Sequence, residues 1–288
     1  MDYSSVEELI KLAEENDTTI SEIVQLVEKE ESEESISEIR KKMMTNLIVM
    51  KDAVHRGLSG EIKSSSGLVG GESHLFLEND QLLTDGLYKQ VIAYGLAVAE
   101  VNAGMGRIVA GPTAGSSGII PAVIIAMGEK LNFSDEEMCD ALFTASGFGE
   151  IVALNATLAG AAGGCQAECG AAAAMAAGAA VEMLGGTPEM AAQAFALALK
   201  NLLGLVCDPV AGLVEVPCVK RNGFSAAHAI TAVSMAMSGI ESVIPPDEVI
   251  LAMAEIGDLM HSSLKETAEG GLAVTPTGLK IKERLKKN

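Results

Sequence analysis

Apolar residues recur along this chain at the three- and four-residue spacing of amphipathic α-helices, and no segment shows the sustained alternation of a β-strand. We expect about ten helices on this pattern. At four places a Ser or Thr followed three residues later by Glu, the capping box that begins many helices, precedes an amphipathic segment. The pairs are Ser5/Glu8, Thr19/Glu22, Ser35/Glu38 and Ser134/Glu137. The pattern predicts an all-α fold, a multi-helix domain with glycine-rich loops.

The first two helices predict a small N-terminal helical appendage over residues 1–34, followed by the main domain over residues 35–288. The acidic stretch at residues 27–38 is typical of a solvated helix face and linker. A longer helix then ends near Gly57 and leads into the main domain.

Further helices and loops alternate through the main domain. Helices are expected over residues 85–103, 119–131, 135–154, 187–206, 224–240 and 247–267. Glycine-rich loops are expected over residues 64–74 and 105–118. Such loops are candidates for function because they bring backbone N–H groups close to a ligand.

Composition narrows the possible partners and location. Hydrophobic residues make up 49% of the chain but aromatic residues only 3%, which favours close-packed helices built from small and aliphatic side chains. The net charge of −19 makes nucleic acid an improbable partner, because binding a phosphate backbone requires clustered Lys and Arg. The acidic N-terminus lacks a signal-peptide pattern, so we expect a cytoplasmic protein.

One segment has the length and polarity to be considered as a membrane span. Residues 108–128 carry no charged side chain. Pro112 and Pro121 flank a Gly/Ser/Thr loop within the segment, which would leave backbone groups unpaired in lipid. We therefore expect no membrane partner.

Five cysteines, an odd number in a reducing compartment, argue against a disulfide framework and leave metal binding, catalysis or burial open. Cys165 and Cys169 lie in the small-residue stretch GCQAECG, and Cys207 and Cys218 bound CDPVAGLVEVPC. Prolines beside the second pair favour a bent backbone of the kind that holds metal-binding thiolates. Zinc is a less suitable metal, because only the first pair approaches the usual spacing of structural zinc ligands.

Several stretches together resemble the alpha chain of the iron–sulfur-dependent bacterial L-serine dehydratase, in order along nearly the whole chain. They are EVNAGMGRIVAGPTAGSSG, NATLAGAAGG, GCQAE, CDPVAGLVEVPCVKRNG and EGGLAVTPTG. The resemblance implies a 4Fe-4S cluster held by three cysteines, which map onto Cys165, Cys207 and Cys218. Cys139 and Cys169 fall outside that pattern, and a supplementary ligand role for Cys169 stays open.

The resemblance also implies the reaction. The enzyme is an L-serine ammonia-lyase that eliminates water from L-serine and yields pyruvate and ammonia. An iron without a protein ligand acts as a Lewis acid on the serine hydroxyl. A beta chain is the implied partner, and we expect it to supply the catalytic base, because none of the four histidines here is a strong candidate. The C-terminus carries no cysteine, so inhibition by a C-terminal cysteine is not expected.

Candidate substrate-binding residues come from the loops and from the region after Cys218. Arg221 can grip a carboxylate with two hydrogen bonds. The hydroxyl and amide candidates are Ser64, Ser65, Ser66, Asn102, Thr113, Ser116 and Asn155.

Alternative functions are an L-cysteine desulfidase-like cluster lyase and a non-enzymatic iron–sulfur scaffold or redox sensor.

Overall fold

The computed structural model describes residues 2–80, 83–84 and 86–287. These residues form thirteen α-helices and contain no strand, which confirms the all-α prediction. The first six helices are α1 (Val6–Glu15), α2 (Ile20–Ser32), α3 (Ile36–Leu58), α4 (Glu72–Glu78), α5 (Gly86–Ala103) and α6 (Ile119–Leu131). The others are α7 (Asp135–Asn155), α8 (Gly160–Gly163), α9 (Ala171–Met183), α10 (Pro188–Lys200), α11 (Cys218–Met237), α12 (Pro246–Leu259) and α13 (Pro276–Leu285).

The capping pairs begin the helices that they predict. Full capping boxes start α2, α3 and α7. At α1 the Ser5 hydroxyl accepts from the Glu8 N–H, but the Glu8 carboxylate binds Ser4 instead of Ser5. These four helix starts are well predicted because side-chain capping is a local interaction.

Several predicted helix boundaries are wrong. Helix α10 ends at Lys200 rather than reaching Cys207, and α12 ends at Leu259 rather than residue 267. Helix α11 begins at Cys218, six residues before the predicted start. Helix α4 begins inside the predicted loop 64–74, and α13 was not predicted. The first residue of the helix predicted over 85–103, Asp85, lies outside the described residues.

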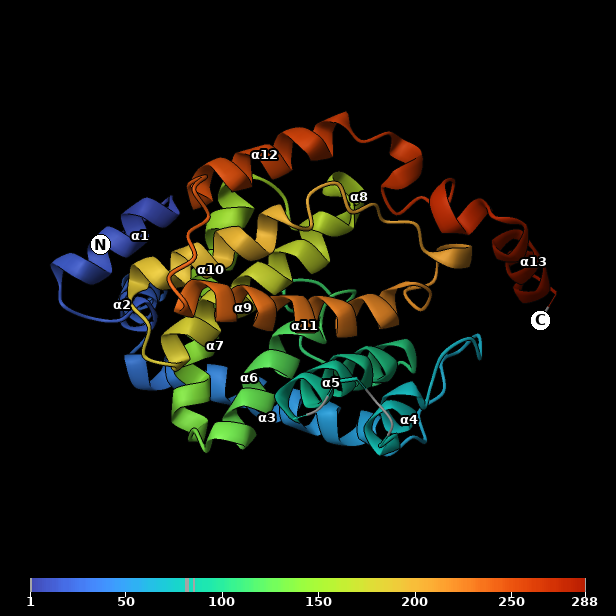
Figure 1. Ribbon diagram of the computed structural model, residues 1–288, viewed down its shortest axis with the longest axis horizontal. Helices are drawn as coiled ribbons and strands as arrows, with labels where there is room; N and C mark the ends of the chain where they lie inside the picture. The colour runs from blue at the N-terminus through green and yellow to red at the C-terminus, as the bar shows by residue number, and fades with distance from the viewer. Residues whose placement is uncertain (1, 81–82, 85, 288) are drawn as a thin grey trace.

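Helix α9 forms the centre of the bundle. Its residues from Ala171 to Val181 are all buried, and it packs against α6, α7, α10 and α11. Alanine and glycine side chains allow the neighbouring helix axes to approach closely. Helices α3, α5 and α6 lie on one side of this centre in Figure 1, and α12 lies on the other.

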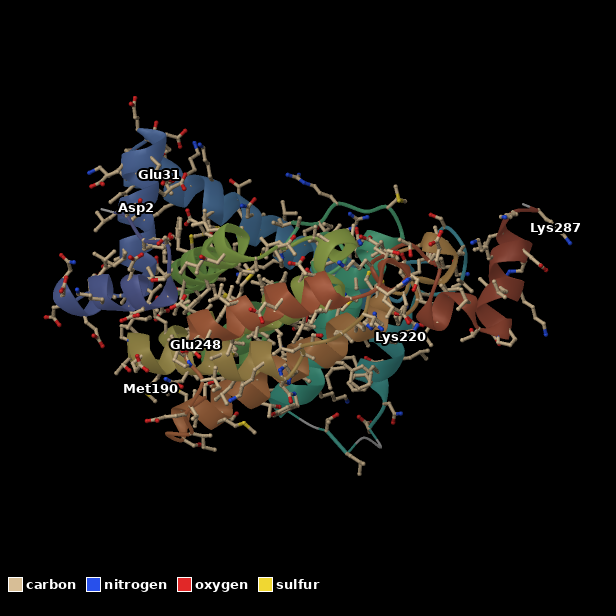
Figure 2. All side chains as sticks on the ribbon, turned by 90° about the horizontal axis from the view of Figure 1, so that it is seen from above. Asp2, Glu31, Met190, Lys220, Glu248 and Lys287 are labelled. Atoms are coloured by element: carbon tan, nitrogen blue, oxygen red, sulfur yellow. The ribbon has the colours of Figure 1, made fainter. Side chains whose placement is uncertain are left out.

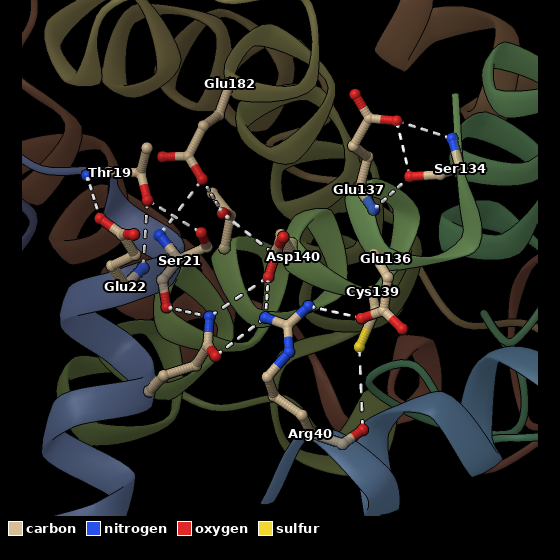
Figure 3. A network of polar contacts seen from close by, with 12 residues as sticks. Thr19, Ser21, Glu22, Arg40, Ser134, Glu136, Glu137, Cys139, Asp140 and Glu182 are labelled. Carbon is tan, nitrogen blue, oxygen red and sulfur yellow. Dashed lines mark hydrogen bonds and ion pairs between the residues drawn. The ribbon is translucent and has the colours of Figure 1, made fainter. Parts of the chain in front are cut away.

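The predicted appendage packs directly on the main domain. Leu9 of α1 and Ile20 and Ile23 of α2 are fully buried in the same hydrophobic cluster as α7 and α9. Polar contacts also cross this junction. The Ser21 N–H donates to Glu182, as Figure 3 shows, and the Gln25 amide nitrogen donates to Asp140 at 3.3 Å. The domain division at residue 34 stays a prediction.

Glu182 anchors the start of α2, and replacing it should destabilise the fold. Its carboxylate accepts from the Ile20 N–H at 2.7 Å, the Ser21 N–H at 3.2 Å and the Thr144 hydroxyl. We expect Glu182→Ala to lower the free energy of unfolding by about 1–3 kcal/mol, because buried donors lose their acceptor. Chemical denaturation measures this, with the exposed Glu255→Ala on α12 as control. Equal stability of the two variants would contradict the anchoring role.

The two ends of the chain lie at opposite ends of the molecule's long axis (Figure 1). Asp2 and Glu31 are labelled at one end in Figure 2, and Lys287 at the other. No helix among the described residues combines the length and apolar character that crossing a bilayer requires.

Candidate metal centre

Four of the five cysteines line one cavity of about 230 Å³. The described lining residues come from the loop before α6, the turn before α9, the loop between α10 and α11, and the segment after α12. They are Thr113, Ala114, Gly115, Cys165, Glu168, Cys169, Cys207, Pro209, Val214, Cys218 and Glu266. The structure therefore brings together the three cysteines predicted as ligands, although they are far apart in sequence.

Cys165 and Cys169 are held by an unusual turn. Residues Gln166–Gly170 form a π-helical turn that continues directly into α9. Side chains on such turns point differently from those on an α-helix, and these turns occur frequently at functional sites. The Cys169 thiol donates to the Cys165 sulfur and lowers the pKa of Cys165, so Cys165 is the thiol of this pair that ionises first.

Cys207 lies in a short β-bridge with the segment after α12. Its N–H donates to the Leu264 carbonyl at 2.8 Å, and its carbonyl accepts from the Glu266 N–H at 2.8 Å. These bonds form an isolated bridge between residues 207 and 265. The bridge fixes the Cys207 sulfur and draws the segment after α12 to the edge of the cavity.

Cys218 is the first residue of α11 and follows Pro217. One turn later, the Asn222 amide nitrogen donates to the Cys218 carbonyl at 2.9 Å and to the Gly115 carbonyl at 2.8 Å. Its amide oxygen accepts from the Gly118 N–H at 2.8 Å. Asn222 therefore ties the PTAGSSG loop to the helix that begins with Cys218.

The donor set suits a soft metal or an iron–sulfur cluster. Burial raises the pKa of Cys218 to about 12 and raises the pKa of Cys207 further. These thiols are protonated without a metal, and a bound metal ion would convert them to thiolates. Thiolates are the ligands of iron–sulfur clusters. The residues present therefore fit such a group, and the four thiols also equal the donor number of a structural zinc site.

Arg221 supports the Cys207 loop. Its guanidinium donates to the Val206 carbonyl and to Asp208 Oδ1, both at 2.9 Å. Asp208 Oδ2 accepts from the Leu272 N–H at 2.8 Å, which links this loop to the C-terminal segment. The arginine predicted to bind a substrate carboxylate thus holds the residues on both sides of Cys207. Its substrate role stays a prediction.

Three of the other candidates belong to the cavity wall or its support. Thr113 lines the cavity and donates to Glu168 Oε1 at 2.6 Å. The buried Ser116 hydroxyl donates to the Gly111 carbonyl at 3.2 Å, within the same loop. The Asn102 amide nitrogen donates to the Ala114 carbonyl at 3.0 Å and so supports a lining residue.

The remaining candidates do not appear among the described residues that line the cavity. Ser66 donates to Glu215 of the loop between α10 and α11, and Ser64 closes its own turn with Val69. Ser65 is exposed. The Asn155 amide donates to the Ser4 carbonyl at 2.7 Å. Substrate binding by these residues stays a prediction.

Sequence reasoning missed two carboxylates in the cavity, Glu168 and Glu266. Each has an oxygen that, together with the Cys207 sulfur, belongs to a group of atoms within 4.8 Å of one another. Such a group could also hold a metal ion. Glu168 lies between the two cysteines of GCQAECG, three residues after the predicted ligand Cys165, and this closeness was the available signal. No histidine occurs among the described lining residues.

The described residues form an all-helical protein with a thiol-lined cavity whose donors fit a soft metal or an iron–sulfur cluster. The chain belongs to the serine dehydratase alpha chain family, whose model matches residues 15–273. It is 49% identical to the probable L-serine dehydratase alpha chain of Bacillus subtilis, covering 98% of this chain and 95% of that protein.

Two other relatives show how such chains are organised. The L-serine dehydratase alpha chain of Peptoniphilus asaccharolyticus is 40% identical, and the match covers 97% of each chain. The L-serine dehydratase TdcG of Escherichia coli is 34% identical, and the match covers 95% of this chain but only 62% of that protein. The family thus includes proteins of about this length and longer ones.

Proposed function

We propose that this chain is the cluster-binding alpha subunit of an L-serine dehydratase that converts L-serine to pyruvate and ammonia. The observation that carries the proposal is the convergence of Cys165, Cys207 and Cys218 on one buried cavity. Family membership and the names of the relatives support serine as the substrate.

Cys165, Cys207 and Cys218 would hold a 4Fe-4S cluster, and Cys169 would stabilise Cys165 through a hydrogen bond. Three thiolates leave one iron without a protein ligand, and that iron would supply a Lewis acid for the serine hydroxyl. The overall reaction loses water from serine, and the resulting aminoacrylate tautomerises to an imine. Hydrolysis of the imine takes up one water and releases pyruvate and ammonia.

This chain's own residues orient the site. The ion pair between Arg221 and Asp208 holds the backbone beside Cys207 at fixed geometry. Asn222 performs the same task for Cys218 and the PTAGSSG loop. Because the four lining cysteines are buried, charges beside them are screened less than in water.

A partner chain would complete the active site. The longer single-chain relatives have room for a further domain, since the present chain matches only 62% of TdcG. We propose that a separate beta chain corresponds to that additional part and supplies the base that removes the serine Cα proton. Among the lining residues described, no histidine is available for that task.

Metal analysis and an activity assay together test the proposal. Protein reconstituted anaerobically with iron and sulfide should show visible absorption at about 400 nm from thiolate-ligated iron. With its beta chain it should release pyruvate from L-serine. Zinc in place of iron, or iron with no pyruvate release, would contradict the proposal and favour the scaffold or sensor alternative. Faster release of sulfide from L-cysteine than of pyruvate from L-serine would favour the desulfidase alternative.

A further inference from the structure

The two carboxylates in the thiol-lined cavity lack a cationic partner. Glu168 is 8% exposed, whereas Glu266 lies at the exposed rim. Among the described residues, no Lys, Arg or His forms an ion pair with either. Like charges within 4.8 Å of each other repel, and burial of one increases the cost. The arrangement becomes favourable when a cation lies between them.

The surrounding backbone is shaped to hold the Glu168 carboxylate. A Cβ atom at Gly160 would lie 2.3 Å from Glu168 Oε2, and a Cβ atom at Gly115 would lie 3.2 Å from Oε1. Thr113 fixes Oε1 by its hydrogen bond at 2.6 Å. Two glycine-rich segments therefore meet around one carboxylate, and any larger residue at Gly160 would displace it.

One oxygen of Glu168 is poorly satisfied. The donor to Oε2 is the Cys207 thiol, at a sulfur–oxygen distance of 3.8 Å. A cysteine that binds metal as a thiolate has no proton to donate. With Cys207 bound to a cluster, Oε2 would face the cavity as an acceptor without that donor.

Glu266 is held at the rim by an unusual backbone. Its φ angle of 62° lies in the left-handed region, which non-glycine residues seldom adopt. The hydrogen bond from its N–H to the Cys207 carbonyl maintains this conformation. The structure thus accepts local strain where the side chain lines the cavity opposite Glu168.

We propose that Glu168 and Glu266 form the subsite that binds the ammonium group of the amino-acid substrate. An ammonium group carries three donors and one positive charge, which two carboxylates can accept. A divalent cation such as Ca²⁺ requires more oxygen ligands than this pair provides once Cys207 is committed to the cluster. The inference rests on the proposed function, which places an amino acid in this cavity.

The test compares two ligands that differ only in the ammonium group, L-alanine and propanoate. Neither has a hydroxyl to eliminate, so their dissociation constants can be measured without turnover. Ligand-observed NMR titration of the anaerobically reconstituted enzyme with its beta chain gives both constants. The wild-type protein should bind L-alanine about 10- to 100-fold more tightly than propanoate.

Charge-removing variants should abolish this preference selectively. Glu168→Gln should reduce the preference for L-alanine over propanoate about tenfold or more. Glu266→Gln should reduce it several-fold, because a hydrogen bond to an exposed charged group contributes less to binding. Propanoate affinity and iron content should stay unchanged in both. Glu269→Gln, at an exposed position three residues after Glu266, is the matched control and should retain the wild-type ratio.

Three results would overturn the subsite. They are equal weakening of both ligands, an unchanged ratio in both variants, and loss of iron from Glu168→Gln, which would make Glu168 a metal ligand. Should Glu168→Gln fail to fold, the result for Glu266→Gln decides. A wild-type protein that prefers L-alanine but releases no pyruvate from serine would refute the proposed function alone. Pyruvate release without any preference for L-alanine would refute the subsite alone.

Discussion

Alanine at Cys165, Cys207 or Cys218 should remove the bound cluster and lower pyruvate release by at least about 100-fold, since loss of a ligand should cost no less than loss of an outer-shell partner. Each thiol lines the same cavity, and each is positioned by a different part of the fold. Among the described lining residues, Cys169 alone offers a substitute thiol. Iron content, sulfide content and visible absorption after anaerobic reconstitution measure the loss directly.

Two control variants separate ligand loss from general damage. Cys139 is buried on α7, outside the set of described lining residues, so Cys139→Ala should keep its iron. Cys169→Ala should keep most of the iron but change the ionisation of Cys165, because it removes the hydrogen bond between the two sulfurs. Full iron content in two of the three ligand variants would refute the assignment. Loss of iron from Cys169→Ala would make Cys169 a ligand.

Local signals made much of the helical fold predictable. Ser35/Glu38 and Ser134/Glu137 begin α3 and α7 because capping depends on residues only three positions apart. The start of α11 at Cys218 was not predictable in this way. It depends on Asn222 bonding to Gly115, more than one hundred positions away in sequence. Contacts of that range leave no local pattern.

The arrangement of the cavity was likewise not predictable from local sequence patterns. The cysteines were identified by residue type, but the π-helical turn that orients Cys165 and Cys169 has no simple sequence signature. The spacing of apolar residues predicted one helix over residues 247–267, which placed Glu266 near its end. The bridge to Cys207 instead places it beside a thiol in the structure. Arg221 has the chemistry of a substrate-binding residue, and only the structure reveals its bonds to Val206 and Asp208.

Addition of the beta chain should raise the turnover of the reconstituted chain about 10²- to 10⁴-fold, the usual contribution of a positioned general base. The described cavity wall offers thiols, a threonine and two carboxylates, but no histidine. Glu266 at the exposed rim shows that the cavity is open toward one side, where a second chain can reach it. Closure there would also exclude water and strengthen charge interactions at the reacting carbon.

Titration of the reconstituted chain with beta chain, monitored by initial rates of pyruvate release, measures this dependence. The rate should saturate at a fixed ratio of the two chains. Chain carrying Cys207→Ala should remain inactive at every ratio, because the beta chain cannot replace the cluster. Cluster content of the wild-type alpha chain should be the same before and after addition, so that the rate increase reports the missing catalytic group and not metal loading. Full turnover by the isolated chain, with no change on addition, would place the base among this chain's own residues and assign the beta chain a role outside proton transfer.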